Sequence, residues 1–219
     1  MSLSPEDRNV ARAAKLDTAS ISDAMDRLRI SGQCQRIAPR DPSFRLTGRA
    51  FTVLYRASGT LPGTVGDYID DVPAGSVIAL DNGGREDATV WGDLLTETAH
   101  RRGIAGTVID GICRDVTVCL GLGYPVYSRG HWMRTGKDRV EVEATNVPIT
   151  IGGARVAPGD LLRGDADGIV AIRRADEERV LAAAEEIEAT ENRIREAIRA
   201  GSRLDEARAS VRYHELQRK

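Results

Sequence analysis

Three short apolar runs alternate with two helical patterns between residues 76 and 130, and this alternation limits the possible folds more than any other feature. In the first helical pattern, 85–103, apolar residues recur at helical spacing. The second pattern spans 115–123. Near-continuous apolar strands joined by helices are typical of parallel strands buried between layers. We therefore expect an α/β core with the strands SVIALDNGG (76–84), IAGTVIDG (104–111) and YPVYSRG (124–130).

The flanking segments extend this core on both sides. Residues 17–30 form a helical pattern that Asp17 or Thr18 can cap, 31–45 predict a loop, and 46–57 alternate as a strand does. After residue 139, polar and apolar residues alternate between glycine turns, which predicts antiparallel strands. An amphipathic helix and a short second helix after Gly201 would close the chain. We see no linker, so we predict one domain, 1–219, with 175–219 as a C-terminal helical extension.

Composition excludes several classes of protein. The 219 residues carry a formal net charge of -2 and only 4% aromatic residues, which disfavours a basic or base-stacking nucleic-acid surface. The three cysteines, Cys34, Cys113 and Cys119, have irregular spacing, which argues against a disulfide scaffold or a zinc site. Neither a signal peptide nor a membrane span is expected. We predict a cytoplasmic protein that binds no nucleic acid and no membrane.

Two strand-to-helix transitions, VWGDLL and DGICRD, are the candidate site. In open α/β sheets, ligands bind where strands end and helices begin, and free N–H groups at a helix start attract anions. We expect Leu94 and Leu95 to offer their amides to a carboxylate, because Gly92 lets the chain approach closely.

The acidic and basic residues of these transitions suggest metal-assisted chemistry. Asp115 could hold a hard divalent cation such as Mg²⁺, and Asp93 could reach the waters of that cation. Arg114 could donate to a ketone or enolate oxygen, where negative charge grows in the transition state. From the residues alone, a solvated surface ion pair between Arg114 and Asp115 is the more common explanation of the same dipeptide.

The spacing of Asp93, 20 intervening residues and Arg114-Asp115 resembles the D-x20-R-D signature of class II pyruvate aldolases in the RraA-like family. DNGG, WGDLLTETAHRRGIAGTVIDGICRDV, LGYPVYSRG and VAPGDLLRGDADGIVAI also resemble that family, from about residue 15 to about residue 200. The resemblance implies a swivelling β/β/α-type core, assembled as a homotrimer or homohexamer with sites at subunit interfaces.

The activity that this resemblance implies is that of 4-hydroxy-4-methyl-2-oxoglutarate/4-carboxy-4-hydroxy-2-oxoadipate aldolase. Such a lyase releases pyruvate from a 4-hydroxy-2-oxo (di)carboxylic acid, and oxaloacetate decarboxylation would be a side activity. By resemblance, Asp115 binds Mg²⁺, Mn²⁺ or another divalent cation, and Arg114 contacts the keto oxygen. The pyruvate half of the substrate would be bound by Gly92, Asp93, Leu94 and Leu95. A neighbouring subunit's helix would bring a glutamate, matched here to Glu191, near the metal waters.

Some residues do not match the aldolase pattern. Three residues, His131, Trp132 and Lys137, correspond to no substrate-binding residues of those enzymes. The chemical identity of the distal part of the substrate is therefore not predicted. His131 is either a surface residue or a contact to a second carboxylate. Schiff-base chemistry is not expected, because Lys137 falls in a polar turn away from the motifs. The segment GDADG, with Asp165 and Asp167, predicts a β-turn rather than a calcium loop.

A binding protein is the rival class. Some RraA-like proteins inhibit a ribonuclease by protein–protein contact, and regulators of that type lack the first aspartate of the signature. Asp93 is present here, which favours an enzyme. A methyltransferase is not expected, because GLGYPV opens a strand instead of the helix that a nucleoside-binding loop needs.

Overall fold

Four parallel strands form the centre of the molecule in the computed structural model, which describes residues 5–59 and 63–211. They lie in the order β3 (Leu46–Ala57), β4 (Val77–Thr89), β5 (Gly106–Cys113) and β6 (Val126–His131). Two helices, α3 (Asp93–Arg101) and α4 (Val116–Leu122), connect β4 to β5 and β5 to β6. Every residue of β5 is buried, as its continuous apolar sequence predicts for a central strand. The expected α/β core is confirmed.

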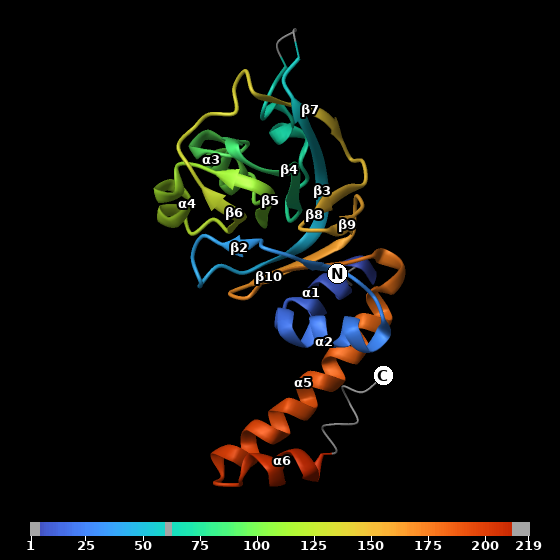
Figure 1. The fold of residues 1–219 in the computed structure, drawn as a ribbon. Helices are drawn as coiled ribbons and strands as arrows, with labels where there is room; N and C mark the ends of the chain where they lie inside the picture. Colours follow the sequence, from blue (N-terminus) through green and yellow to red (C-terminus); the bar gives the residue numbers. More distant parts are fainter. Residues whose placement is uncertain (1–4, 60–62, 212–219) are drawn as a thin grey trace.

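Antiparallel strands extend the sheet on both sides of this centre. The strands β1 (Gln33–Cys34), β11 (Gly168–Ile172) and β10 (Leu161–Asp165) continue it from the first half of β3, and β7 (Val140–Thr145) pairs with the second half. At the far edge, β2 (Ala38–Pro39) pairs with β6. A separate hairpin joins β8 (Ile149–Ile151) to β9 (Ala154–Val156). Figure 1 shows α3 and α4 on one side of the parallel strands and this hairpin on the other.

A second helical layer covers β10 and β11. It contains α1 (Pro5–Ala13), α2 (Thr18–Leu28) and α5 (Glu177–Arg199), whose apolar faces meet in a core that includes Met25, Ile172 and Leu181. The Asp17 carboxylate accepts the Ser20 N–H at 2.7 Å and so caps α2. In Figure 1, α5 runs away from the sheet and α6 (Leu204–Ser210) folds back against its outer end. The structure also contains two 3-10 helices, η1 (Asp67–Asp71) and η2 (Arg174–Asp176).

Three predictions of local structure were wrong or incomplete. The helix expected over 85–103 begins only at Asp93, because the strand β4 continues to Thr89 and pairs Arg85 with Gly111 and Thr89 with Ile112. The expected loop 31–45 contains the short strands β1 and β2, which are added to sheet edges formed by distant residues. Helix α1 was not predicted, and the tail of the expected last helix, 212–216, lies outside the described residues.

None of the helices among the described residues is both long enough and apolar enough to cross a membrane.

Candidate active site

The start of α3 is fixed by the buried Trp91. Its indole N–H donates to the Thr96 hydroxyl at 2.9 Å, and that hydroxyl donates to the Gly92 carbonyl at 2.8 Å. The ring also stacks on Tyr124, with 6.2 Å between centroids. Because the Trp91 carbonyl accepts the Arg114 N–H at 2.9 Å, the segment that follows β4 is bonded directly to the residue that follows β5. The two predicted strand-to-helix transitions therefore lie side by side.

Arg114 and Asp115 converge on the same point. Asp115 has the left-handed conformation, with φ 54°, immediately before α4. This conformation is uncommon for a residue with a side chain, so the fold holds the aspartate in a specific position. Its Oδ2 accepts the Asp93 N–H at 3.1 Å and lies 3.2 Å from the Arg114 Nε. The carboxylate thus joins the start of α3 to the guanidinium.

Gly92 provides the space for this convergence. A Cβ at this position would lie 2.8 Å from the Asp115 Oδ2 and 3.1 Å from the Arg114 Nε. A side chain here would push against both groups, so glycine permits this close approach, while its φ of -151° is ordinary extended backbone. Gly92, Asp93 and Arg114 line one cavity, and Asp115, which does not line it, contacts Asp93 and Arg114 through its Oδ2.

The N–H groups at the start of α3 already hold carboxylate oxygens. Asp93 donates its N–H to Asp115, and the Leu94 N–H donates to the Asp93 Oδ1 at 2.8 Å. The start of α3 therefore holds carboxylates of the chain itself, through the amides of Asp93 and Leu94. A substrate carboxylate would have to replace these internal contacts. The Leu94 side chain is 78% exposed, so its apolar part makes little contact with the rest of the molecule.

A cavity of about 720 Å³ opens beside this cluster. Gly92, Asp93, Leu94, Leu95 and Arg114 line it, together with η1 and the loop that precedes it. A third wall comes from residues 135–137, which include Lys137. A volume of this size is in the range of small-molecule sites. Sequence reasoning missed the η1 and 135–137 walls, because both come from segments without a recognisable motif.

Two thiols next to the site are unsuited to nucleophilic or metal-binding roles. Burial raises the pKa of Cys113, although the Ser128 hydroxyl acts in the opposite direction. Burial also raises the pKa of Cys119 to about 11. Because the thiolate is the reactive form, both side chains stay protonated and unreactive at neutral pH. Neither thiol is therefore a candidate nucleophile.

The carboxylate of Asp115 fits a hard divalent cation. Its side chain is 36% exposed, and its second oxygen, Oδ1, accepts no hydrogen bond from the residues that the structure describes. Within the same residues, no group of three or more His, Cys, Asp or Glu side chains forms a metal cage. Mg²⁺ is commonly held by one or two carboxylates and completes its shell with waters and substrate oxygens. The donor set is thus adequate for a divalent cation that keeps several waters.

The other predicted residues, except Lys137, do not line the cavity. His131 and Trp132 are exposed, and neither lines the cavity, whereas Lys137 does. Glu191 lies on the outer half of α5, where it pairs with Arg195 at 2.7 Å. Asp165 accepts the Thr18 hydroxyl at 2.7 Å, and the turn from β10 to β11 follows it. GDADG is therefore a β-turn, as predicted.

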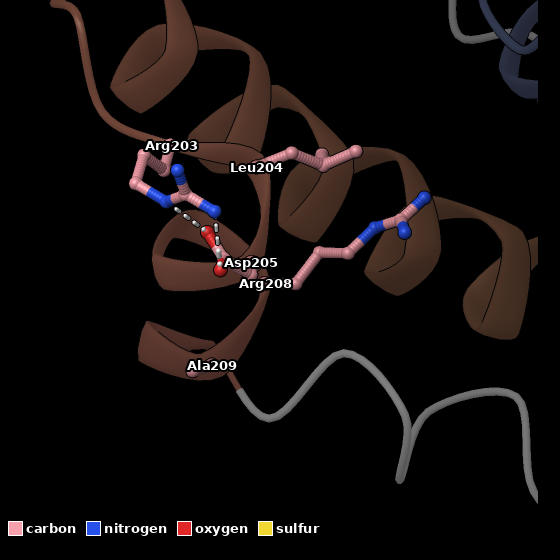
Figure 2. A pocket seen from close by; sticks show the side chains of 5 residues that line it. All are labelled: Arg203, Leu204, Asp205, Arg208 and Ala209. Atoms are coloured by element: carbon pink, nitrogen blue, oxygen red, sulfur yellow. Dashed lines mark hydrogen bonds and ion pairs between the residues drawn. The ribbon is translucent and has the colours of Figure 1, made fainter.

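A second hollow, of about 570 Å³, lies at the outer end of the α5–α6 hairpin. Figure 2 shows its side chains, among which Arg203 forms an ion pair with Asp205 at 3.1 Å. The residues around it are those of α6 and the turn before it, and none of the predicted site residues belongs to them. Its wall includes the Arg203–Asp205 ion pair and consists mostly of exposed residues, so it resembles an open surface crevice.

Comparisons with known proteins concern the family and the fold of the chain. The sequence profile of the RraA-like family, described as Aldolase/RraA, matches residues 18–171. Protein DlpA of Legionella pneumophila is 39% identical over 202 residues, which are 91% of this chain and 33% of that protein. The chain therefore spans about a third of the length of that relative. A protein of Halalkalibacterium halodurans named "Putative 4-hydroxy-4-methyl-2-oxoglutarate aldolase" is 33% identical, over 84% of this chain and 85% of its own length.

Solved structures share the fold. An uncharacterized protein from Pseudomonas syringae pv. tomato is 43% identical and superposes with a TM-score of 0.87, over 92% of this chain and 97% of its own. RraAS2 of Streptomyces coelicolor, titled an unusual member of the RNase ES inhibitor RraA protein family, is 24% identical with a TM-score of 0.79. That alignment covers 84% of this chain and 95% of RraAS2. At 24% identity the second likeness concerns the fold alone.

Proposed function

The chain belongs to the RraA-like family, with the fold expected of it, and we propose that it is a divalent-metal-dependent lyase that releases pyruvate from a 4-hydroxy-2-oxo (di)carboxylic acid. One observation carries the proposal: the Asp93 N–H, the Arg114 guanidinium and the Asp115 carboxylate meet over Gly92 beside a cavity of about 720 Å³. The aldolase name of the Halalkalibacterium halodurans relative supports the same reaction class.

Substrate binding begins at the helix start. The N–H groups of Asp93 and Leu94, which now donate to carboxylate oxygens of the chain itself, would donate instead to the carboxylate of the 2-oxo acid. The absence of a side chain at Gly92 lets the substrate approach the backbone closely. This contact fixes the pyruvate half and places its ketone toward Arg114.

Bond cleavage needs stabilisation of an enolate. Asp115 would hold a divalent cation such as Mg²⁺ or Mn²⁺, which supplies Lewis-acid polarisation of the ketone. The Arg114 guanidinium donates a hydrogen bond to the same ketone oxygen, where negative charge accumulates as the reaction proceeds. This arrangement stabilises the transition state more than the ground state, which is the requirement for catalysis.

The proton balance assigns a role to Asp93. Removal of the C4 hydroxyl proton makes C4 a carbonyl, and the electron pair of the C3–C4 bond passes to the pyruvate half as its enolate. A proton delivered to C3 then gives pyruvate. Asp93 lines the cavity and would position the water that moves these protons. Oxaloacetate decarboxylation yields the same enolate with loss of CO₂, so we expect it as a side activity.

The test is an assay of pyruvate release from 4-hydroxy-4-methyl-2-oxoglutarate and from oxaloacetate, with Mg²⁺ and with EDTA. We expect activity with Mg²⁺ and loss of activity with EDTA. Asp115→Ala should abolish activity with the fold intact, and Arg114→Ala should lower the rate by about 10²–10³-fold. Equal rates with Mg²⁺ and with EDTA would end the metal hypothesis.

Two further measurements separate this proposal from its rivals. Protein treated with borohydride and substrate, and then freed of both before the assay, should keep its activity, because a Schiff base on Lys137 is not part of the mechanism. Capture of a purified ribonuclease, together with no lyase activity on either substrate, would instead support a regulator. The RNase-inhibitor title belongs to a relative with 24% identity, and it supports no function for this chain.

A further inference from the structure

We propose that Lys137 recognises the distal carboxylate of a dicarboxylic substrate and so determines the specificity of the cleft. This inference rests on the proposed function, because it takes the pyruvate half to bind at Gly92 and Arg114. Lys137 lines the same cavity as these two residues, although 23 positions separate it from Arg114 in the chain.

The loop that carries Lys137 is held against the end of β4. Both the Thr89 N–H and the Thr89 hydroxyl donate to the Arg134 carbonyl, at 3.1 and 2.9 Å. A Cβ on Gly136 would lie 2.1 Å from the Thr89 carbonyl oxygen, so these two backbones are in direct contact. Thr89 is three residues from Gly92, which limits their separation to about 10 Å. Lys137 is therefore placed within reach of a substrate bound at Gly92.

The charges around the cavity leave the Lys137 ammonium available. Asp70 pairs with Arg102 at 3.5 Å, Arg114 pairs with Asp115, and the Asp93 carboxylate accepts the Leu94 N–H. The Lys137 ammonium makes no ion pair with the residues that the structure describes. A substrate carboxylate would supply the missing partner for this exposed ammonium.

Asp67, on the η1 wall of the same cavity, opposes this attraction. Its carboxylate also lacks an ion-pair partner within the described part of the chain. A dianionic ligand is therefore attracted by Lys137 and repelled by Asp67, while a monoanionic ligand of the same length is affected little by either. Removal of the Lys137 charge should therefore weaken the preference for a dianionic ligand, and removal of the Asp67 charge should strengthen it.

The test compares two five-carbon ligands that share the 2-oxo acid half. In 2-oxoglutarate a carboxylate stands where 2-oxopentanoate has a methyl group, so the ratio of their dissociation constants isolates the distal charge. Calorimetry with Mg²⁺ should show that Lys137→Met weakens 2-oxoglutarate binding by about three- to tenfold and leaves 2-oxopentanoate nearly unchanged. Lys137→Arg should keep the wild-type ratio, and Asp67→Asn should shift it toward 2-oxoglutarate.

The control is Lys15→Met, which removes the same charge from an exposed position between α1 and α2 and should leave both affinities unchanged. If the wild-type protein binds both ligands and Lys137→Met leaves their ratio unaltered, the role of Lys137 is refuted while the 2-oxo acid site stands. If the wild-type protein binds neither ligand, the 2-oxo acid site itself is refuted, and the role of Lys137 with it.

Discussion

Gly92→Ala is the substitution that tests the site most directly. The added Cβ would lie 2.8 Å from the Asp115 Oδ2, whereas ordinary contacts of this kind begin near 3.4 Å. The carboxylate oxygen must therefore retreat by about 0.6 Å, and the Arg114 Nε, at 3.1 Å, must also move. Misplacement of a reacting group by 1 Å costs about 10²-fold, so a shift of this size should lower kcat/KM by about 10- to 100-fold.

The same substitution should leave the fold nearly as stable as before. The Arg114 and Asp115 side chains are 37% and 36% exposed, so both can move without opening a buried cavity. The backbone of Gly92 is extended and accepts an alanine. Alanine is a poorer residue than glycine before a helix, which predicts a loss of about 1 kcal/mol or less. For a chain of this size that corresponds to a Tm lowered by about 2–4 °C.

The assay follows pyruvate release by coupling it to the oxidation of NADH, with Tm measured on the same preparations. Gly121→Ala is the matched control, because a Cβ at this position in α4 meets nothing within 4 Å. We expect full activity from the control and an unchanged or slightly higher Tm. Wild-type kcat/KM in Gly92→Ala, with a normal Tm, would refute the claim that the space over Gly92 positions the catalytic groups.

Two stability predictions concern buried carboxylates. Burial alone would raise the pKa of Asp165, but hydrogen bonds from Thr18 and from the Asp167 N–H outweigh it and lower that pKa. Its contribution is therefore present above the unfolded pKa of about 3.9 and is lost as the pH falls through the lower folded value. Chemical denaturation between pH 6 and pH 3 should show a flatter pH dependence in Asp165→Asn, and equal slopes would contradict this. Asp110 accepts the Arg129 Nε and the Gly152 N–H at 2.5 and 2.8 Å, so Asp110→Ala should lower the unfolding free energy by about 3 kcal/mol.

The central strands and helices could be predicted because their sequences are locally consistent. The apolar run of β5 and the helical spacing in α3 each identify one element without knowledge of the rest. The extension of β4 to Thr89 could not be predicted in this way, since Arg85 and Thr89 become strand residues only by pairing with Gly111 and Ile112. That pairing is interrupted by irregularities in register, and no local pattern in 85–89 indicates them.

In the candidate site, too, some residues could be placed from local sequence and others only from tertiary contacts. Gly92, Asp93, Arg114 and Asp115 could be placed together, because carboxyl ends of neighbouring parallel strands meet at one edge of a sheet. Lys137 could not, since its distance along the chain suggested a remote turn, and only the contact between Gly136 and Thr89 brings it to the cavity. A motif therefore identifies the reacting half of such a site, while the residues that surround the remainder of a ligand depend on loop packing.

The length of β3 has a consequence for how the chain tolerates change. Leu46–Arg49 pair with β10, Ala50–Leu54 pair with β4, and Val53–Ala57 pair with β7, so one strand aligns three partners. A single residue inserted near position 50 would turn every later side chain of β3 to the opposite face. The chain would then lose its alignment with the parallel and antiparallel parts of the sheet at once. Insertions and deletions should be rarer in this strand than in any surface turn.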